Sequence, residues 1–280
     1  MNTQHIKNVH LCGIGGAGMS GLARVLLEQG AVVRGSDRVP TAVTEKLIEL
    51  GVDVRYTEDA SNLSPQAELV VYSAAVKPDH PERIRASELG IRQEKYATVL
   101  GELTAQRESI CISGTHGKTT KTNLTAAILQ RAGMKPGWVI GGVPASLPAQ
   151  ACWGQGQHFV VESCEYDHSF LNLHPSVAVL HNIEPDHMDY FGTVDKLRAA
   201  FAEFASRVPA KGMIFANAED EGAMAVASGC GRDVTTYGFK KSADIRASDV
   251  RIVRGKPRFT LSREGHALAR CELAMPGRVN

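Results

Sequence analysis

Short apolar runs alternate with amphipathic stretches along the first hundred residues. The run Val9-His10-Leu11-Cys12 is typical of a buried strand, and the apolar positions of residues 19–28 recur at helical spacing. The alternation continues and predicts strands at 31–34, 52–56, 69–72 and near Ile91, with helices at 44–50, 81–89 and 97–103. Strands that alternate with helices predict a parallel, doubly wound α/β sheet of the Rossmann type.

The alternation resumes after a polar connector at residues 104–108. It predicts strands at 110–112, 138–140, 158–161, 176–180, 213–216 and 234–239, and helices at 122–131, 193–205 and 219–227. Further on, 250–253 and 258–261 predict a β-hairpin joined through Gly255-Lys256-Pro257, and 269–273 predicts another strand. We expect two α/β domains, residues 1–106 and 107–280.

A glycine-rich segment between the strand at 110–112 and the next helix carries the most specific chemistry. Its glycines would let several N–H groups point at one anion, the lysine would reach the terminal phosphates of a nucleotide, and the first threonine would ligate Mg²⁺. Ile112 stands where the usual pattern has a further glycine, so this would be a shortened P-loop; an ordinary glycine-rich turn is the alternative. The predicted ATP-binding residues are Gly114, Thr115, His116, Gly117, Lys118, Thr119 and Thr120.

A second glycine turn, G-x-G-x-x-G, follows the first predicted strand. Such a turn can bind a diphosphate, which both a nucleotide sugar and NAD contain. The alternative is that the turn only allows the strand and the helix to pack closely. Two phosphate-type turns in tandem argue against a simple dehydrogenase. The predicted diphosphate-site residues are Gly13, Gly15, Gly16, Ala17, Gly18 and Met19, with Ser36, Asp37, Ser73 and Ala74 at the ends of two later strands.

Two acidic segments follow predicted strands of the second half. Because the carboxyl ends of parallel strands share one edge of a sheet, we expect both segments to lie beside the P-loop. Carboxylates with a tolerated imidazole suit Mg²⁺. We therefore predict Thr119, Glu162 and His187 as metal ligands, the alternative being that Glu162 caps a loop and His187 is a packing residue.

The composition argues against several classes of protein but does not identify a function. A content of 43% hydrophobic residues in 280 allows two domains with cores, and a formal net charge of +1 gives no general attraction for nucleic acid or anionic membranes. The six scattered cysteines and a polar N-terminus favour reduced thiols in the cytoplasm, and no apolar run approaches the length of a membrane span. We expect a monomer or weak homodimer.

Taken together, these motifs resemble the Mur ligases of bacterial cell-wall synthesis, most closely the branch that adds L-alanine. The similarity extends over nearly the whole chain and is carried by residues 13–19, 114–120, 162–170, 182–189, 236–239 and 276–278.

This resemblance implies an ATP-dependent ligase of peptidoglycan precursor synthesis, with one domain for the UDP-sugar and one for Mg-ATP. The lactyl carboxylate of UDP-N-acetylmuramate would attack the γ-phosphoryl group of ATP, and the amine of L-alanine would then displace phosphate. Lys118, Glu162 and His187 are the catalytic residues that the resemblance implies, and Asn280 would contact the nucleotide.

The family has a third, C-terminal domain, so we expect a fragment with an incomplete central domain that ligates poorly, if at all. Three positions depart from the family pattern: Lys121 interrupts a threonine run, Cys164 replaces an acid, and Val279 replaces a histidine. Three alternatives stay open, namely a recycling ligase that adds a tripeptide to the same sugar nucleotide, a non-catalytic nucleotide-sugar-binding module, and an NAD-dependent oxidoreductase.

Overall fold

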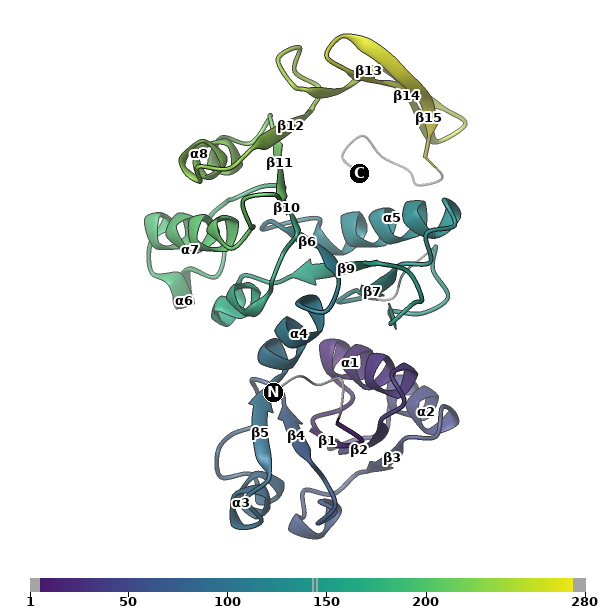
Figure 1. Ribbon diagram of the computed structural model, residues 1–280, viewed down its shortest axis with the longest axis vertical. Coiled ribbons are helices and arrows are strands. Elements are labelled where there is room, and N and C mark those ends of the chain that lie inside the picture. Colours follow the sequence, from purple (N-terminus) through teal and green to yellow (C-terminus); the bar gives the residue numbers. More distant parts are fainter. Residues whose placement is uncertain (1–5, 143, 145, 274–280) are drawn as a thin grey trace. The chain divides into compact units, whose positions relative to one another are not determined.

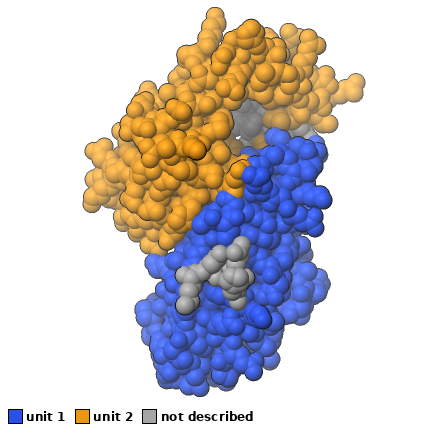
Figure 2. All heavy atoms as spheres, viewed as in Figure 1, with its two compact units in different colours: residues 1–107, 125–161 blue, residues 108–124, 162–280 orange. Residues whose placement is uncertain are grey.

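The computed structural model describes residues 6–142, 144 and 146–273, and Figure 1 gives its secondary-structure elements. The chain forms two compact units. Unit 1 comprises residues 1–107 and 125–161, and unit 2 comprises residues 108–124 and 162–280, as coloured in Figure 2. The predicted α/β class, with a parallel sheet preceding a second sheet, is confirmed.

The first sheet, in unit 1, has five strands that all run parallel. The strands are β1 (Asn8–Cys12), β2 (Val32–Ser36), β3 (Asp53–Arg55), β4 (Leu69–Tyr72) and β5 (Arg92–Lys95), in the order β3-β2-β1-β4-β5. The chain first builds outward from β1 to β3 and then returns to β4 on the other side of β1. The strand order therefore reverses between β1 and β4, and that is where ligands bind in open α/β sheets.

Three helices and one 3₁₀ turn connect these strands, namely α1 (Ala17–Glu28), α2 (Ala42–Glu49), η2 (Ala60–Asn62) and α3 (Pro81–Glu88), and α4 (Tyr96–Thr104) follows β5. Thr41 caps α2 through a capping box with Thr44, and Pro81 begins α3 at the position where a missing N–H costs nothing. Leu11, Leu22 and Leu69 are fully buried and form part of the core between sheet and helices.

The second sheet has ten strands in the order β15-β14-β13-β12-β11-β10-β6-β9-β7-β8. The strands are β6 (Glu108–Ser113), β7 (Gly137–Val139), β8 (Ala151–Cys152), β9 (His158–Ser163), β10 (Val177–Leu180), β11 (Met213–Asn217), β12 (Val234–Gly238), β13 (Ile245–Val253), β14 (Lys256–Arg263) and β15 (His266–Glu272). Strand β10 pairs parallel with both β6 and β11, whereas β14 pairs antiparallel with both β13 and β15.

The helices after β6 are α5 (Lys118–Arg131), α6 (Met188–Phe191), α7 (Val194–Ser206) and α8 (Glu221–Gly229), with a 3₁₀ segment η3 (Tyr166–Asn172). An aromatic cluster anchors η3 to α7. The Phe170 ring stacks on Phe204 with centroids 4.9 Å apart and meets Phe201 edge-on at 5.1 Å. This packing fixes the segment that begins just after Glu162.

Some predicted element bounds were wrong. The P-loop helix begins at Lys118 rather than residue 122, β9 continues through Glu162 to Ser163, and Lys256 and Pro257 belong to β14 rather than to the hairpin turn. The pattern also missed β8 and α6, which are too short for a hydrophobic period to appear, and η3, which is interrupted by left-handed backbone angles at Asp167 and His168. Among the described residues, no helix is long and apolar enough to cross a membrane.

Candidate nucleotide-binding sites

The glycine loop between β6 and α5 has a conformation that requires its glycines. Gly114 has φ +148° and Gly117 has φ +76°, and a Cβ on Gly114 would lie 2.8 Å from Oδ1 of Asn182. Asn182 follows β10 and fixes the loop, because its carbonyl accepts from Thr115 N and its Oδ1 accepts from His116 N, both at 2.9 Å. The sequence did not indicate this role for Asn182.

Lys118, the first residue of α5, is folded back onto its own loop. Its Nζ donates to the carbonyl of Gly114 at 2.6 Å, to that of Thr115 at 3.1 Å, and to both carboxylate oxygens of Glu165 at 3.0 and 2.8 Å. Glu165 is 1% exposed, so this ion pair is shielded from water. Sequence reasoning grouped Glu165 with ordinary loop acids and missed it; its position three residues after Glu162 was the available signal.

Two of the predicted metal ligands lie together. The Thr119 hydroxyl donates to Oε1 of Glu162 at 2.9 Å. Both oxygens are suited to a hard divalent cation. Thr120 follows Thr119 in the first helical turn and is half-buried.

The third predicted ligand, His187, lies in a different group. Its Nε2 is 3.9 Å from Oδ2 of Asp186, and donor atoms of His187, Asp186 and Glu165 lie within 4.8 Å of one another, a group that does not include Glu162. His187 has left-handed backbone angles at the start of α6 and its ring lies 5.0 Å from that of Tyr166. Oxygen donors therefore occur at two points near Lys118, and each includes part of the predicted set.

One side of the loop carries a lysine and a histidine. Nζ of Lys121 lies 2.7 Å from the point where a Cβ on Gly117 would be, and His181 Nε2 is 3.9 Å from that point. Nδ1 of His181 shares a hydrogen bond of 2.8 Å with the hydroxyl of Tyr237. Burial, together with the charge of Lys121 and against that of Asp220, lowers the pKa of His181 to about 4. His181 is therefore neutral at neutral pH.

The G-x-G-x-x-G turn of unit 1 is held by the end of β2. The N–H groups of Gly13 and Ile14 donate to the Ser36 carbonyl at 2.9 and 3.0 Å, and Gly15 N donates to Oδ2 of Asp37 at 2.7 Å. Asp37, predicted as a ligand residue, thus accepts from the turn itself. A Cβ on Gly18 would lie 2.7 Å from the ring of Tyr96, so Gly18 permits close packing of the helix.

A cleft of about 650 Å³ opens beside this turn. Six of the ten predicted diphosphate-site residues line it: Gly13, Gly15, Gly16, Ser36, Asp37 and Ser73. The other four, Ala17, Gly18, Met19 and Ala74, are not among its lining residues; Met19 is 2% exposed and belongs to the core. Arg38, Lys77 and His80 also line the cleft, and sequence reasoning missed them because they lie outside the glycine motif.

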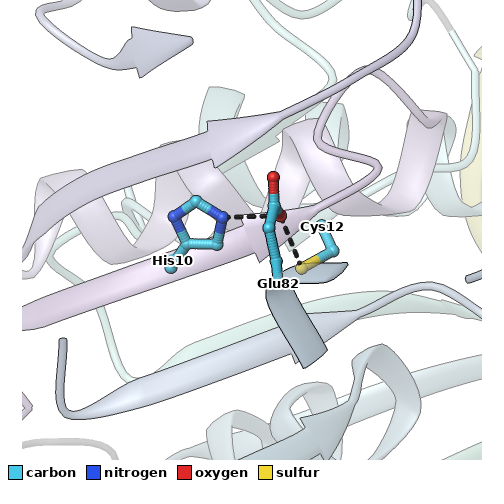
Figure 3. Close-up of side chains that lie close together, drawn as sticks. All are labelled: His10, Cys12 and Glu82. Carbon is cyan, nitrogen blue, oxygen red and sulfur yellow. Dashed lines mark hydrogen bonds and ion pairs between the residues drawn. The ribbon is translucent and has the colours of Figure 1, made fainter. Parts of the chain in front are cut away.

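Glu82 is the centre of a buried polar cluster. Its Oε2 accepts from His10 Nε2 at 2.8 Å and from Cys12 Sγ at 3.1 Å (Figure 3). The same oxygen accepts from Ser36 Oγ at 2.6 Å, and Oε1 accepts from Asn62 at 2.8 Å. Burial by itself would raise the pKa of Glu82, but the hydrogen bond and charge of His10 and the bonds from Ser36 and Asn62 hold it at about 2. Ser36 links this cluster to the glycine turn through its carbonyl.

A Rossmann-type sheet with a glycine-turn cleft, followed by a sheet with a P-loop, defines a nucleotide-binding α/β protein with one candidate site in each unit. The family model described as "Mur ligase family, catalytic domain" matches residues 8–108, and "Mur ligase middle domain" matches residues 112–280. The chain belongs to the Mur ligase family.

Curated proteins of similar sequence support the assignment to this family. A "UDP-N-acetylmuramate--L-alanine ligase" of Janthinobacterium sp. (strain Marseille) is 43% identical over 276 residues, which are 98% of this chain and 59% of that protein. The chain thus spans about three fifths of the length of such relatives.

Two solved structures are also similar. The UDP-N-acetylmuramate:L-alanyl-gamma-D-glutamyl-meso-diaminopimelate ligase from Neisseria meningitides is 28% identical with a TM-score of 0.88, covering 98% of this chain and 89% of that one. The UDP-N-acetylmuramate-alanine ligase from Thermotoga maritima is 27% identical with a TM-score of 0.84, covering 98% and 61%.

Proposed function

We propose that this chain is the UDP-sugar-binding and ATP-binding part of a cytoplasmic ligase that joins L-alanine to the lactyl carboxylate of UDP-N-acetylmuramate. The observation that carries the proposal is the P-loop at the start of α5, where Lys118 pairs with Glu165 and Thr119 donates to Glu162. The 43% identity to a named alanine ligase over 98% of the chain supports the substrates. The proposed domains are residues 1–106 and 107–280.

The reaction proceeds through an acyl phosphate. A carboxylate oxygen of the sugar acid forms a bond to the γ-phosphorus of ATP while the bond to the β-γ bridging oxygen breaks and ADP leaves. The alanine amine then attacks the acyl carbon, phosphate leaves, and the amine loses a proton. Because two anions must meet, the protein's task is to position them and to neutralise charge.

To bind ATP, Lys118 has to exchange its present hydrogen-bond acceptors for phosphate oxygens. Its ammonium is held by Glu165 and by the carbonyls of Gly114 and Thr115. Bound ATP would draw Nζ from these acceptors to its terminal phosphates.

Mg²⁺ fits the oxygen-rich donor set beside the loop, with Thr119 and Glu162 at one point and His187 beside Asp186 at another. When bound, it would neutralise charge on the phosphates. In unit 1, the cleft lined by Gly13, Gly15 and Gly16 would take the diphosphate of UDP-N-acetylmuramate at the start of α1, whose first N–H groups would bind the anion.

The test is calorimetric titration of the 280-residue chain with UDP-N-acetylmuramate, with Mg-ATP and with NAD. We expect the sugar nucleotide and Mg-ATP to bind, each with one site, and NAD to show no saturable binding. Tight NAD binding combined with no response to the sugar nucleotide would refute the proposal.

A second candidate is the ligase that adds a tripeptide to the same sugar nucleotide. The TM-score of 0.88 with coverage of 89% of the Neisseria enzyme favours it. Phosphate release by the full-length protein, measured with L-alanine or with the tripeptide L-alanyl-γ-D-glutamyl-meso-diaminopimelate as acceptor, separates the two candidates.

A further inference from the structure

Lys121 has no role in the reaction described above, yet its side chain lies over the glycine loop. The residue belongs to the first turn of α5, and its backbone N–H donates to the Gly117 carbonyl at 3.1 Å. The half-buried side chain turns back so that Nζ lies 2.7 Å from the point where a Cβ on Gly117 would be. The ammonium is thus held beside the loop rather than extended into solvent.

The two lysines of the loop differ in their acceptors. Lys118 donates to two carbonyls and to both oxygens of Glu165. Within the described ranges 6–142, 144 and 146–273, Lys121 Nζ has neither a carboxylate nor a hydrogen-bond acceptor at bonding distance. Nδ1 of its neighbour His181 is bonded to the hydroxyl of Tyr237, and Oδ1 of Asp220 accepts from Ile183 N and Ala223 N.

This position is electrostatically unfavourable for an unpaired cation. The N-terminus of a helix carries a partial positive charge, so a lysine in the first turn is repelled by it. The loop N–H groups add further positive potential at the same place. An ammonium that is half-buried there is stabilised only when an anion joins it.

We propose that Lys121 is a second phosphate-binding lysine, which donates to the polyphosphate chain of the bound nucleotide alongside Lys118. This inference rests on the proposed function, because it takes the glycine loop as the ATP site. It assigns Lys121 to binding, and the ligand chemistry is that of a polyphosphate anion.

The experiment compares the 280-residue chain with its Lys121→Gln and Lys121→Arg variants. Lys211→Gln is the matched control, since Lys211 is exposed and lies far from the loop in the sequence. Calorimetry measures the Kd for Mg-ATP and for inorganic triphosphate with Mg²⁺. A lost charge-assisted hydrogen bond predicts affinity about tenfold weaker, or more, for both ligands in Lys121→Gln. Lys121→Arg and Lys211→Gln should stay near wild type.

The melting temperature of the ligand-free protein is a second measurement, in which Lys121→Gln should gain rather than lose. Removal of an unpaired cation from the start of α5 should raise the melting temperature of the ligand-free protein by about 1–3 °C. Lys121→Gln should therefore be more stable without ligand while gaining less stability from Mg-ATP. A variant that is merely misfolded would lose on both counts.

Equal Kd values for wild type and Lys121→Gln would overturn the inference and leave the proposed function intact. Weaker Mg-ATP binding with unchanged triphosphate binding would also overturn it, because Lys121 would then contact the nucleoside rather than phosphate. A wild-type chain that binds UDP-N-acetylmuramate but not Mg-ATP would refute the ATP site itself, and the inference with it.

Discussion

Glu82 is a buried carboxylate that connects four elements of unit 1. It receives hydrogen bonds from His10 and Cys12 on β1, from Ser36 on β2 and from Asn62 in η2, while it belongs to α3. A buried ionised carboxylate is tolerated only when it is well paired, and here the pairing outweighs burial enough to keep the pKa at about 2. The sequence did not single out this residue, because nothing in its local pattern distinguishes it from an exposed acid at the start of a helix.

The pKa of Glu82 predicts how stability depends on pH. The folded-state pKa of about 2 lies below the ordinary value of 4.5, so the unfolded chain takes up this proton first as the pH falls. The contribution, about 3 kcal/mol, is complete above about pH 5 and is lost as the pH falls toward 2. Glu82→Gln should therefore lower the melting temperature strongly at pH 6 and much less at pH 3.

Thermal unfolding across that pH range measures this difference. Glu49→Gln, at an exposed position of α2, is the control and should follow wild type throughout. A gap between wild type and Glu82→Gln that stays constant from pH 6 to pH 3 would mean that packing, not ionisation, is what the carboxylate contributes.

At the scale of elements, the β6-loop-α5 connection depends on the backbone of Gly114. Alanine at this position would combine an unfavourable φ of +148° with a Cβ 2.8 Å from Asn182 Oδ1 and 3.1 Å from Asn182 N. We expect Gly114→Ala to lose at least 2 kcal/mol of unfolding free energy, since strain of about 1–2 kcal/mol adds to overpacking of about 1–3 kcal/mol. It should also weaken Mg-ATP binding, because Asn182 could no longer fix the loop.

The variant Gly133→Ala separates backbone strain from overpacking against Asn182. Gly133 also has a positive φ, +75°, but a Cβ there would have no atom within 4 Å. Urea unfolding should therefore show a loss in Gly133→Ala from backbone strain alone, with ATP affinity unchanged. If both variants lose the same stability and the same affinity, contact with Asn182 is not what makes Gly114 necessary.

Apolar runs and hydrophobic period predicted the elements that bury apolar side chains in the core. Strand β4 has the predicted bounds, 69–72, and α7 begins and ends within one residue of the prediction. Short elements such as β8 and α6 do not repeat an apolar position, so they could not be predicted. The same limit applies to the site: Lys118 and Thr119 follow from local spacing, whereas Glu165 and Asn182 act through contacts between residues 47 and 66 positions apart.

For the whole molecule, the two glycine turns belong to separate compact units with different donors. Unit 1 offers the start of α1 and the side chains of Arg38 and Lys77 at a cleft, while unit 2 offers carboxylates, a hydroxyl and an imidazole beside its loop. Asn280, predicted to contact the nucleotide, and Val279 lie outside the described residues. The roles of the predicted site residues, and the domain limits at 106 and 107, stay predictions.

This division predicts a selective response to metal removal. Treatment with EDTA should weaken ATP binding at least tenfold, since the carboxylates near the loop would repel bare phosphates, and should leave the Kd for UDP-N-acetylmuramate unchanged. Titration of each ligand with and without Mg²⁺ measures the effect. Equal ATP affinity under both conditions would contradict the predicted metal site.

The ion pair between Glu165 and Lys118 bears on the design of inhibitors. A compound directed at the loop has to displace a shielded carboxylate from the ammonium, which holds it through both oxygens. Uncharged heterocycles cannot replace that partner, whereas sulfonates, phosphonates and similar acidic groups can. A screen for ligands of this loop should start from such acidic fragments.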